Sequence, residues 1–272
     1  MTLFSLIILA LVQGITEFLP VSSSGHLILA HSFMGEAQSW ESTKIIDVAV
    51  HVGTLLSVLV YFHKDVWTMI KGIIPFVTFR FTDNAAKLNL HIVIASVPVI
   101  AAGFVLHMLE PGWLLFTEIV AWTTLIFGII LWIADRREEQ SKTLDNLNIK
   151  DAILIGLAQM LALVPGTSRS GITMTASRFL GYSRTESARF SLLLSIIAIA
   201  GAGALGAKDV IESGDATLGI NVLIAVALSF ISGLIAIALM MKWLQKSTFT
   251  PFAIYRIILG VALLIILYGD FV

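Results

Sequence analysis

The sequence predicts an all-α, polytopic integral membrane protein that forms one membrane domain over residues 1–272, and three observations predict it. The chain is 57% hydrophobic and 13% charged, whereas soluble domains are roughly 45–50% apolar and about 25% charged. Six apolar segments are each long enough to cross a bilayer as a helix, which takes roughly 20 residues. Two further apolar regions are interrupted near their middles by polar clusters of proline, glycine and serine.

The six predicted spans follow one another along the chain with short polar connections. They cover about 43–62, 88–109, 114–134, 187–207, 219–241 and 251–269. Residues 65–80 are amphipathic, with Trp67 at the polar edge, which predicts a helix lying in the membrane interface. The N-terminal apolar run lacks a basic flank and a small-residue cleavage site, so we expect it to be retained.

The basic residues predict the orientation of these spans. They gather in alternate connections, at Lys64, Lys71, Arg80, Lys87, Arg136, Arg137, Lys142, Lys150, Arg184, Arg189, Lys242 and Lys246. The connections 35–42, 110–113 and 208–218 are mainly acidic and hold one basic residue, Lys208. By the positive-inside rule the basic connections face the cytoplasm and both termini lie outside.

The two interrupted regions, 2–34 and 151–181, resemble each other. "VQGITEFLPVSSSGH" (12–26) and "LAQMLALVPGTSRSG" (157–171) each carry a glutamine before a proline, followed by a polar cluster. Their arms, about 10–16 residues each, are too short to span, which predicts re-entrant hairpins. Each region precedes three spans, and because three is odd, the two halves would have opposite orientations in the membrane. The sequence thus predicts an inverted repeat, with halves at about 1–135 and 150–272.

The polar clusters predict a phosphate pocket at the meeting point of the hairpins. Broken helices expose N-terminal amides, which attract anions and phosphate above all. The second cluster adds Arg169, whose guanidinium can form paired hydrogen bonds to phosphate and stays charged when desolvated. The net charge of -1 gives no indication of a nucleic-acid partner, and the absence of cysteine excludes thiolate metal sites.

At these residues the sequence resembles a known family. "QGITEFLPVSSSGHL", "PGTSRSG", "VGTLLSVLVYFHKD" and "TPFAIYRIILG" closely resemble segments of the BacA-type undecaprenyl-diphosphate phosphatases, the bacitracin-resistance family of bacteria. The resemblance implies hydrolysis of the lipid carrier diphosphate to the monophosphate and inorganic phosphate, which recycles the carrier for cell-wall synthesis. It also implies a divalent cation, Mg²⁺ or Ca²⁺, and a multi-pass protein of the cytoplasmic membrane whose site opens toward the periplasm. The oligomeric state is left open, with a homodimer as one option.

The resemblance carries functional roles to particular positions. The catalytic candidates are Glu17, Ser23, His26, Ser168 and Arg169. The substrate-binding candidates are Ser22, Ser24, Gly25, Gly166, Thr167 and Ser170. Glu17 and Gln13 are the metal candidates: the family motif has Glu or Gln at the first position, and this chain has the glutamine.

The residues leave several roles open. Glu17 lies one helical turn from Gln13 and could bind a cation or act as a general base. Ser23, His26 or a water molecule could be the nucleophile. Asp47 and His51 share a helix face and could support the site or form a structural pair.

Two interpretations concern residues or functions outside this centre. Tyr255 and Arg256 are interpreted as anchors at the membrane interface rather than catalytic groups. A transporter or flippase of a polyprenyl phosphate lipid is the competing function, because secondary transporters also use inverted repeats with broken helices.

Overall fold

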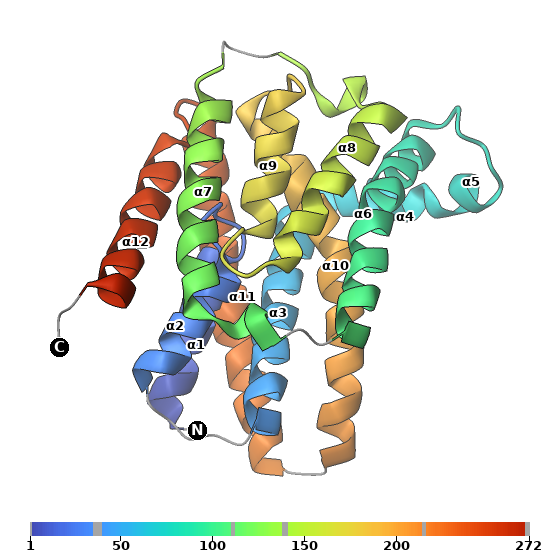
Figure 1. Cartoon of the computed structure of the whole chain (residues 1–272). Coiled ribbons are helices and arrows are strands. Elements are labelled where there is room, and N and C mark those ends of the chain that lie inside the picture. The colour runs from blue at the N-terminus through green and yellow to red at the C-terminus, as the bar shows by residue number, and fades with distance from the viewer. Residues whose placement is uncertain (1, 35–39, 110–111, 138–140, 214–215, 270–272) are drawn as a thin grey trace.

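A computed structural model describes residues 2–34, 40–109, 112–137, 141–213 and 216–269 of the chain. In these residues the fold is helical, and the only bridge of strand type joins Lys142 and Tyr182. The helices run roughly along one axis and form a bundle (Figure 1). Their bounds are α1 Leu3–Thr16, α2 Ser23–Met34, α3 Trp40–Tyr61, α4 His63–Lys71, α5 Ile73–Val77, α6 Asn84–Leu109, α7 Thr117–Asp135, α8 Ile149–Met160, α9 Arg169–Phe179, α10 Arg184–Ser213, α11 Ala216–Leu244 and α12 Thr250–Tyr268.

The prediction of an all-α polytopic membrane protein is confirmed. Four stretches within the described helices are long and apolar enough to cross a membrane, at Asn84–Leu106, Thr117–Asp135, Gly219–Leu244 and Thr250–Tyr268. A fifth span is reached if the bent pair Ile46–Tyr61 and His63–Val77 counts as one. The predicted span 187–207 lies in α10, where the side chains from 202 to the end of the helix lie outside the described residues to which this count of spans applies.

The chain turns sharply after α3. The axis bends by 85° between Ile46–Tyr61 and His63–Val77, so α4 and α5 run across the bundle (Figure 1). The predicted helix at 65–80 is therefore two short helices, α4 and α5, which Gly72 separates. Trp67 is exposed, and Lys71 lies over its ring. This geometry agrees with a segment that lies flat at an interface.

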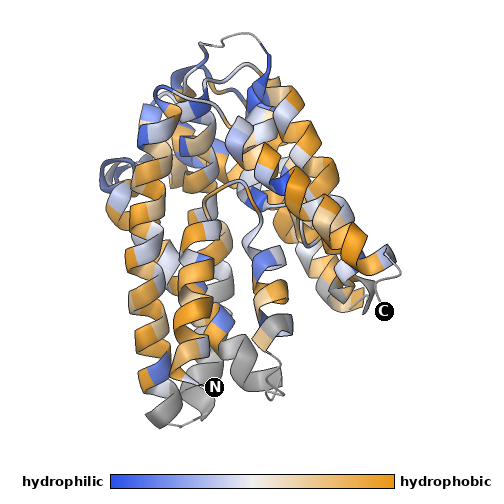
Figure 2. Ribbon diagram, turned by 90° about the vertical axis from the view of Figure 1, so that its left-hand side faces the viewer, coloured by the Kyte–Doolittle hydropathy of each residue, from blue (hydrophilic) through white to orange (hydrophobic). Residues whose placement is uncertain are grey.

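Apolar side chains cover the outside of the bundle as well as its core. Phe18, Phe190 and Phe249 are fully buried between the helices. Large apolar side chains such as Phe104, Leu223 and Ile266 are exposed on the outer faces. Hydrophilic residues gather at the end of the bundle that holds the connections α4–α6 and α7–α8 (Figure 2). In water, this hydrophobic outer surface would stay exposed at a cost in free energy, whereas lipid tails can cover it. The surface is therefore suited to a membrane.

Two pairs of short helices approach each other from opposite ends of the bundle. In Figure 1, α1 and α2 occupy the end near the N-terminus, and α8 and α9 occupy the other end. We call residues 17–22, between α1 and α2, the first tip, and residues 161–168, between α8 and α9, the second tip. The tips touch: Ser170, in the first turn of α9, donates a hydrogen bond to the carbonyl of Leu19 at 3.0 Å.

The two helix pairs match position by position. Thr2 and Asn148 are the N-caps of α1 and α8, and each side chain accepts a hydrogen bond from the amide three residues later. Ser22 and Ser168 precede α2 and α9, and both have positive φ, 77° and 70°. The pairs Thr2 and Asn148, Gln13 and Gln159, and Ser22 and Ser168 share one sequence separation. α1 packs on α11 as α8 packs on α6.

Glycines permit these close helix contacts. A Cβ atom at Gly14 would lie 1.9 Å from the hydroxyl oxygen of Ser232 on α11. A Cβ atom at Gly156 would lie 2.7 Å from the carbonyl oxygen of Ala95 on α6. Small residues at such crossings let backbones approach within van der Waals contact, which is how helices associate in lipid.

Gly156→Ala is expected to lower the thermal unfolding temperature in detergent, because the added methyl group meets backbone that cannot move aside. The matched control is Gly103→Ala on α6, where a Cβ atom would meet only the side chain of Leu163, at 3.5 Å. There the higher helix propensity of alanine, worth up to about 1 kcal/mol, should leave stability equal or raised. Equal melting shifts for the two variants would contradict this account of the α6–α8 contact.

Candidate active site

Each tip is built as a helix break followed by a capped helix start. After α1 ends at Thr16, Pro20 supplies no amide hydrogen, and the chain then bends at Ser22. In the second tip Pro165 is followed by Gly166, with φ 87°, and by Ser168, the N-cap of α9. The Ser22 hydroxyl accepts from the amide of Gly25 at 3.3 Å, as the Ser168 hydroxyl accepts from that of Gly171 at 3.1 Å.

The positive φ values of the two serines are strained backbone for non-glycine residues. Such a residue costs of order 1–3 kcal/mol and persists where the surroundings hold it, often at functional sites. At the second tip the fixing is visible, because the Thr123 hydroxyl donates to the carbonyl of Pro165 at 2.6 Å. The second tip is therefore held in place by α7.

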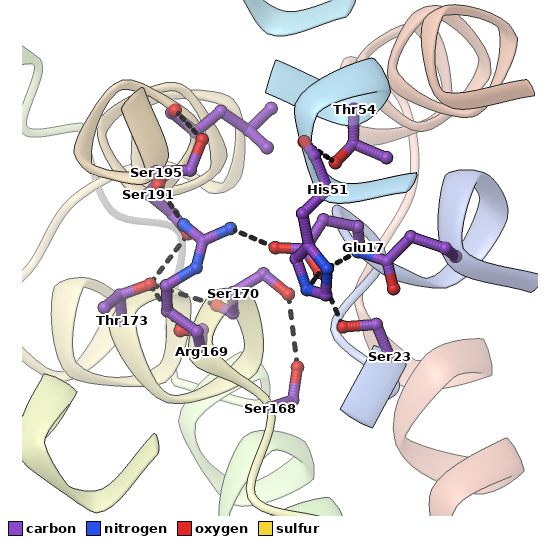
Figure 3. A network of polar contacts seen from close by, with 12 residues as sticks. Glu17, Ser23, His51, Thr54, Ser168, Arg169, Ser170, Thr173, Ser191 and Ser195 are labelled. Atoms are coloured by element: carbon purple, nitrogen blue, oxygen red, sulfur yellow. Dashed lines mark hydrogen bonds and ion pairs between the residues drawn. The ribbon is translucent and has the colours of Figure 1, made fainter. Parts of the chain in front are cut away.

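Glu17 lies at the centre of the polar network in Figure 3. Its carboxylate is 7% exposed and accepts three hydrogen bonds. Oε2 accepts from Nε2 of Gln13 at 2.9 Å and from the Ser23 hydroxyl at 2.6 Å. Oε1 accepts from Nη2 of Arg169 at 2.8 Å. The acid of the first tip and the guanidinium of α9 thus meet directly.

Arg169 bridges the two halves of the molecule. Besides its ion pair with Glu17, its Nη1 donates to the carbonyl of Ser191 on α10 at 3.2 Å. The Thr173 hydroxyl donates to the Arg169 carbonyl at 2.8 Å and contacts the Ser191 hydroxyl at 2.7 Å. These contacts fix the planar guanidinium beside Glu17, whose other carboxylate oxygen accepts from Ser23 (Figure 3). A fixed guanidinium next to a hydroxyl and a carboxylate is suited to bind and neutralise a phosphate group.

His51 enters the site, whereas His26 faces elsewhere. The His51 ring lies beside Glu17 in Figure 3, with Nε2 3.9 Å from Oε2. The His26 ring contacts the Ser22 carbonyl through Nδ1 at 2.6 Å and the Tyr255 hydroxyl through Nε2 at 2.6 Å. In the part of the chain that the structure describes, both ring nitrogens of His26 are thus occupied away from Glu17 and Ser23.

The remaining predicted residues form the walls of the tips. Ser22, Thr167, Ser168 and Ser170 are almost fully buried, and Ser24 is exposed. The Ser168 and Ser170 hydroxyls lie 3.1 Å apart, and those of Ser22 and Ser24 lie 3.4 Å apart. A Cβ atom at Gly25 would lie 3.2 Å from the side chain of Val120, and one at Gly166 would lie 2.1 Å from the hydroxyl oxygen of Thr123, so both glycines permit close packing against α7.

Asp47 and His51 do not form a side-chain pair with each other. The Asp47 carboxylate contacts Nε2 of His31 at 3.2 Å, while Nδ1 of His51 contacts the Asp47 carbonyl at 2.5 Å. Their shared helix face places His51 beside the acid and Asp47 one turn away from it. His51 is therefore the member of this pair that reaches the network.

The interpretation of Arg256 as an interface anchor is wrong. Its side chain is 0% exposed, and it has no carboxylate partner among the described residues. Nη2 donates to the carbonyls of Gly166 at 2.9 Å and Thr167 at 2.8 Å, and Nη1 to that of Pro20 at 3.4 Å. Arg256 thus joins both tips through their backbones. Its place in the motif "TPFAIYRIILG" was the available signal, but an arginine near the end of an apolar run is usually an anchor.

The fold and this centre define a class: a polytopic membrane protein in which two broken helix pairs hold an acid, a hydroxyl and a guanidinium around a site for a phosphate-bearing ligand. The family model described as "Bacitracin resistance protein BacA" matches residues 6–262. The chain belongs to the BacA family.

Curated relatives match over almost their whole length. The chain is 47% identical to the undecaprenyl-diphosphatase of Jannaschia sp. (strain CCS1) over 270 residues, which cover 99% of this chain and 100% of the relative. It is 45% identical to that of Ruegeria pomeroyi, with the same coverage. It is 43% identical to that of Teredinibacter turnerae, covering 97% of this chain and 99% of the relative.

Proposed function

We propose that the protein is an undecaprenyl-diphosphatase, which hydrolyses undecaprenyl diphosphate to undecaprenyl phosphate and inorganic phosphate. The relatives just described carry that name, at 43–47% identity over nearly the full chain. The observation that carries the mechanism is the Ser23–Glu17–Arg169 unit, with the Ser23 hydroxyl 2.6 Å and the Arg169 nitrogen 2.8 Å from the two carboxylate oxygens. Phosphoryl transfer needs a nucleophile, a base and neutralisation of charge, and this unit supplies one residue for each.

Ser23 is the nucleophile in this proposal. Its hydroxyl donates to Glu17, which takes the proton as the serine oxygen bonds to the terminal phosphorus. The bridging P–O bond then breaks, and undecaprenyl phosphate leaves with the electron pair. Water hydrolyses the phosphoserine in the second step, which releases inorganic phosphate and returns the proton to Ser23. Arg169 neutralises the charge on the phosphoryl oxygens.

A divalent cation, Mg²⁺ or Ca²⁺, fits the same centre. Oε1 of Gln13 is buried and has no hydrogen-bond partner among the described residues, and Nε2 of the same amide donates to the Glu17 carboxylate. Carboxylate and amide oxygens are the ligands of hard cations, which take further oxygens from substrate phosphate and water. No group of three or more His, Cys, Asp or Glu side chains in the described residues could hold a metal ion, so in this proposal Glu17 and Gln13 hold the cation together with substrate and water oxygens. When bound, the cation would supply further charge neutralisation of the diphosphate.

An apolar groove beside the first tip supports a lipid substrate. It has a volume of about 540 Å³ and lies between α1, α11 and α12. Its lining includes Leu19 of the first tip, Leu239 and Trp243. A diphosphate at the tips could therefore place its polyprenyl tail in this groove without exposing the tail to water.

The architecture that we propose is an inverted repeat, with six spans and two re-entrant helix pairs, in the bacterial cytoplasmic membrane. Gln13 and Gln159 are separated by the same number of residues as the strained serines Ser22 and Ser168, which supports a repeat. The approach of the two helix pairs from opposite ends of the bundle supports their inverted orientation. The basic residues at one end of the bundle support an orientation with that end in the cytoplasm, and in this proposal the centre opens toward the periplasm.

Phosphate release by the purified protein tests the function. Detergent-solubilised protein should release phosphate from undecaprenyl diphosphate, lose activity in a chelator and regain it with Mg²⁺ or Ca²⁺. Acid quenching of the wild-type reaction with terminally labelled substrate should trap labelled phosphoserine, which Ser23→Ala should not form. Transfer of labelled polyprenyl phosphate across vesicles without any phosphate release would favour the transporter instead. Release with no phosphoenzyme trapped under either acid or alkaline quenching would favour water as the nucleophile.

A further inference from the structure

A second polar pocket lies at the other end of α9 from the active site. Its volume is about 370 Å³, and we call it the distal pocket. It is lined by Arg178, Ser183, Arg184, Thr185, Leu244, Gln245, Lys246, Ser247 and Thr248. α9 carries Arg169 at its first residue and Arg178 near its last, about 14 Å farther along the axis at 1.5 Å per residue. The distal pocket is therefore separate from the Glu17 centre.

The charges of the distal pocket are unbalanced. Its lining contains three cations, Arg178, Arg184 and Lys246, and no acid. Asp135 lies behind the lining and is already occupied, since Oδ1 accepts from Nε of Arg184 at 2.6 Å and Oδ2 from the Thr250 hydroxyl at 3.2 Å. Arg178 and Lys246 have no ion pair with a carboxylate among the described residues.

Arg178 has unused hydrogen-bond donors. Its side chain is 1% exposed, and its Nη1 donates to the carbonyl of Tyr182 at 2.7 Å. Nε and Nη2 are buried and have no partner among the described residues. A buried cation with unpaired N–H groups is costly unless an anion or water completes its hydrogen bonds. This observation points to a ligand at the distal pocket.

The rest of the lining offers further donors for an anion. α10 begins at Arg184, and the first-turn amides of Glu186 and Ser187 already bond to Ser183, which leaves those of Arg184 and Thr185 as donors for an anion. Ser183, Thr185, Ser247 and Thr248 add hydroxyls. Nε1 of Trp243 donates to the Thr248 carbonyl at 3.0 Å, which holds the connection between α11 and α12 against the pocket.

We propose that the distal pocket binds a phosphate group, as inorganic phosphate or as the phosphomonoester headgroup of a lipid. The two arginines can form charge-assisted hydrogen bonds to phosphate oxygens, and Lys246 adds a mobile charge at the rim. The lining belongs to the connections α9–α10 and α11–α12 and includes the basic residues Arg184 and Lys246. The site is independent of the hydrolysis at the Glu17 centre.

Hydrogen exchange of the full-length protein in detergent separates this site from the active site. Sodium phosphate, added at constant ionic strength against sodium chloride, should slow amide exchange in 183–187 and 245–249 in a saturable manner. Lys246→Ala should raise the half-saturating concentration in these segments about fivefold, as expected for an exposed charge. Lys242→Ala, one turn earlier and outside the lining, is the control and should leave it unchanged.

The outcomes distinguish the source of the phosphate and decide the proposal. Protection by inorganic phosphate shows that the headgroup alone suffices, and protection only by a short-chain phosphatidic acid identifies a lipid. Arg178→Gln should remove the protection. If the Arg178→Gln variant does not fold, the half-saturating phosphate concentration of Lys246→Ala decides whether the proposal holds. Protection confined to 17–26 and 165–171, equal protection by chloride, or an unchanged Lys246→Ala response would overturn the proposal.

Discussion

Arg169→Lys is expected to reduce kcat/KM for phosphate release by about 100-fold or more, and Arg169→Ala by about 1,000-fold or more. Nη2 of Arg169 contacts Glu17 while Nη1 contacts the Ser191 carbonyl, so one planar group meets two partners and still faces the reacting centre. A lysine ammonium keeps the charge but has one nitrogen, which cannot reach both partners and a phosphoryl oxygen in the same geometry.

The measurement is steady-state phosphate release with undecaprenyl diphosphate, together with the melting temperature of each variant in detergent. The control is Arg80→Lys, since Arg80 is exposed in the connection between α5 and α6. Its kcat/KM should stay within about twofold of the wild type. An Arg169→Lys protein with wild-type melting and kcat/KM within threefold would refute the role of the guanidinium in neutralising the phosphoryl group.

Arg256→Lys is expected to lower kcat by at least about tenfold and to destabilise the protein. Arg256 donates to carbonyls of both tips, and a lysine in this buried place leaves at least one of them unpaired. Each unpaired buried polar group costs about 1–3 kcal/mol. Looser tips would misplace Ser23 and Arg169 relative to each other, and small misplacements of reacting groups reduce rates strongly.

The control for this prediction is the neighbouring Tyr255→Phe, which removes the hydroxyl that contacts Nε2 of His26 and leaves the arginine intact. We expect Tyr255→Phe to change kcat by less than about threefold. A purely structural role for Arg256 would lower the melting temperature and leave kcat per folded molecule unchanged. Such a result, measured below the melting temperature of the variant, would remove Arg256 from the positioning of the site.

Much of the site could be read from local patterns. The four-residue spacing of Gln13 and Glu17 predicts a shared helix face, and the structure has their side chains hydrogen-bonded at 2.9 Å. The matching clusters around Pro20 and Pro165 predict two tips, and the contact of Ser170 with the Leu19 carbonyl brings them together. These features depend on helical periodicity and on proline, whose effects act within a few residues.

Other features depended on contacts between distant segments. His26 stands in the motif, yet its ring contacts Tyr255 on α12, and it is His51 that lies beside Glu17. Neither arrangement follows from residue spacing, because it depends on how α2, α3 and α12 are rotated against α1. The 85° bend after Tyr61 could not be predicted either, because hydropathy carries no information about the direction of a helix.

The sequence by itself determined the membrane class, the two broken helix pairs and the chemical groups at their tips, because hydropathy, periodicity and proline geometry are local properties. Only the tertiary structure decided that Arg256 is buried between the tips rather than anchored at the interface, and that Arg178 lines a second cationic pocket. The physical reason is that the burial and the hydrogen bonds of an arginine side chain depend on which carbonyls and carboxylates of other helices lie next to it. Those partners come from residues far away in the chain.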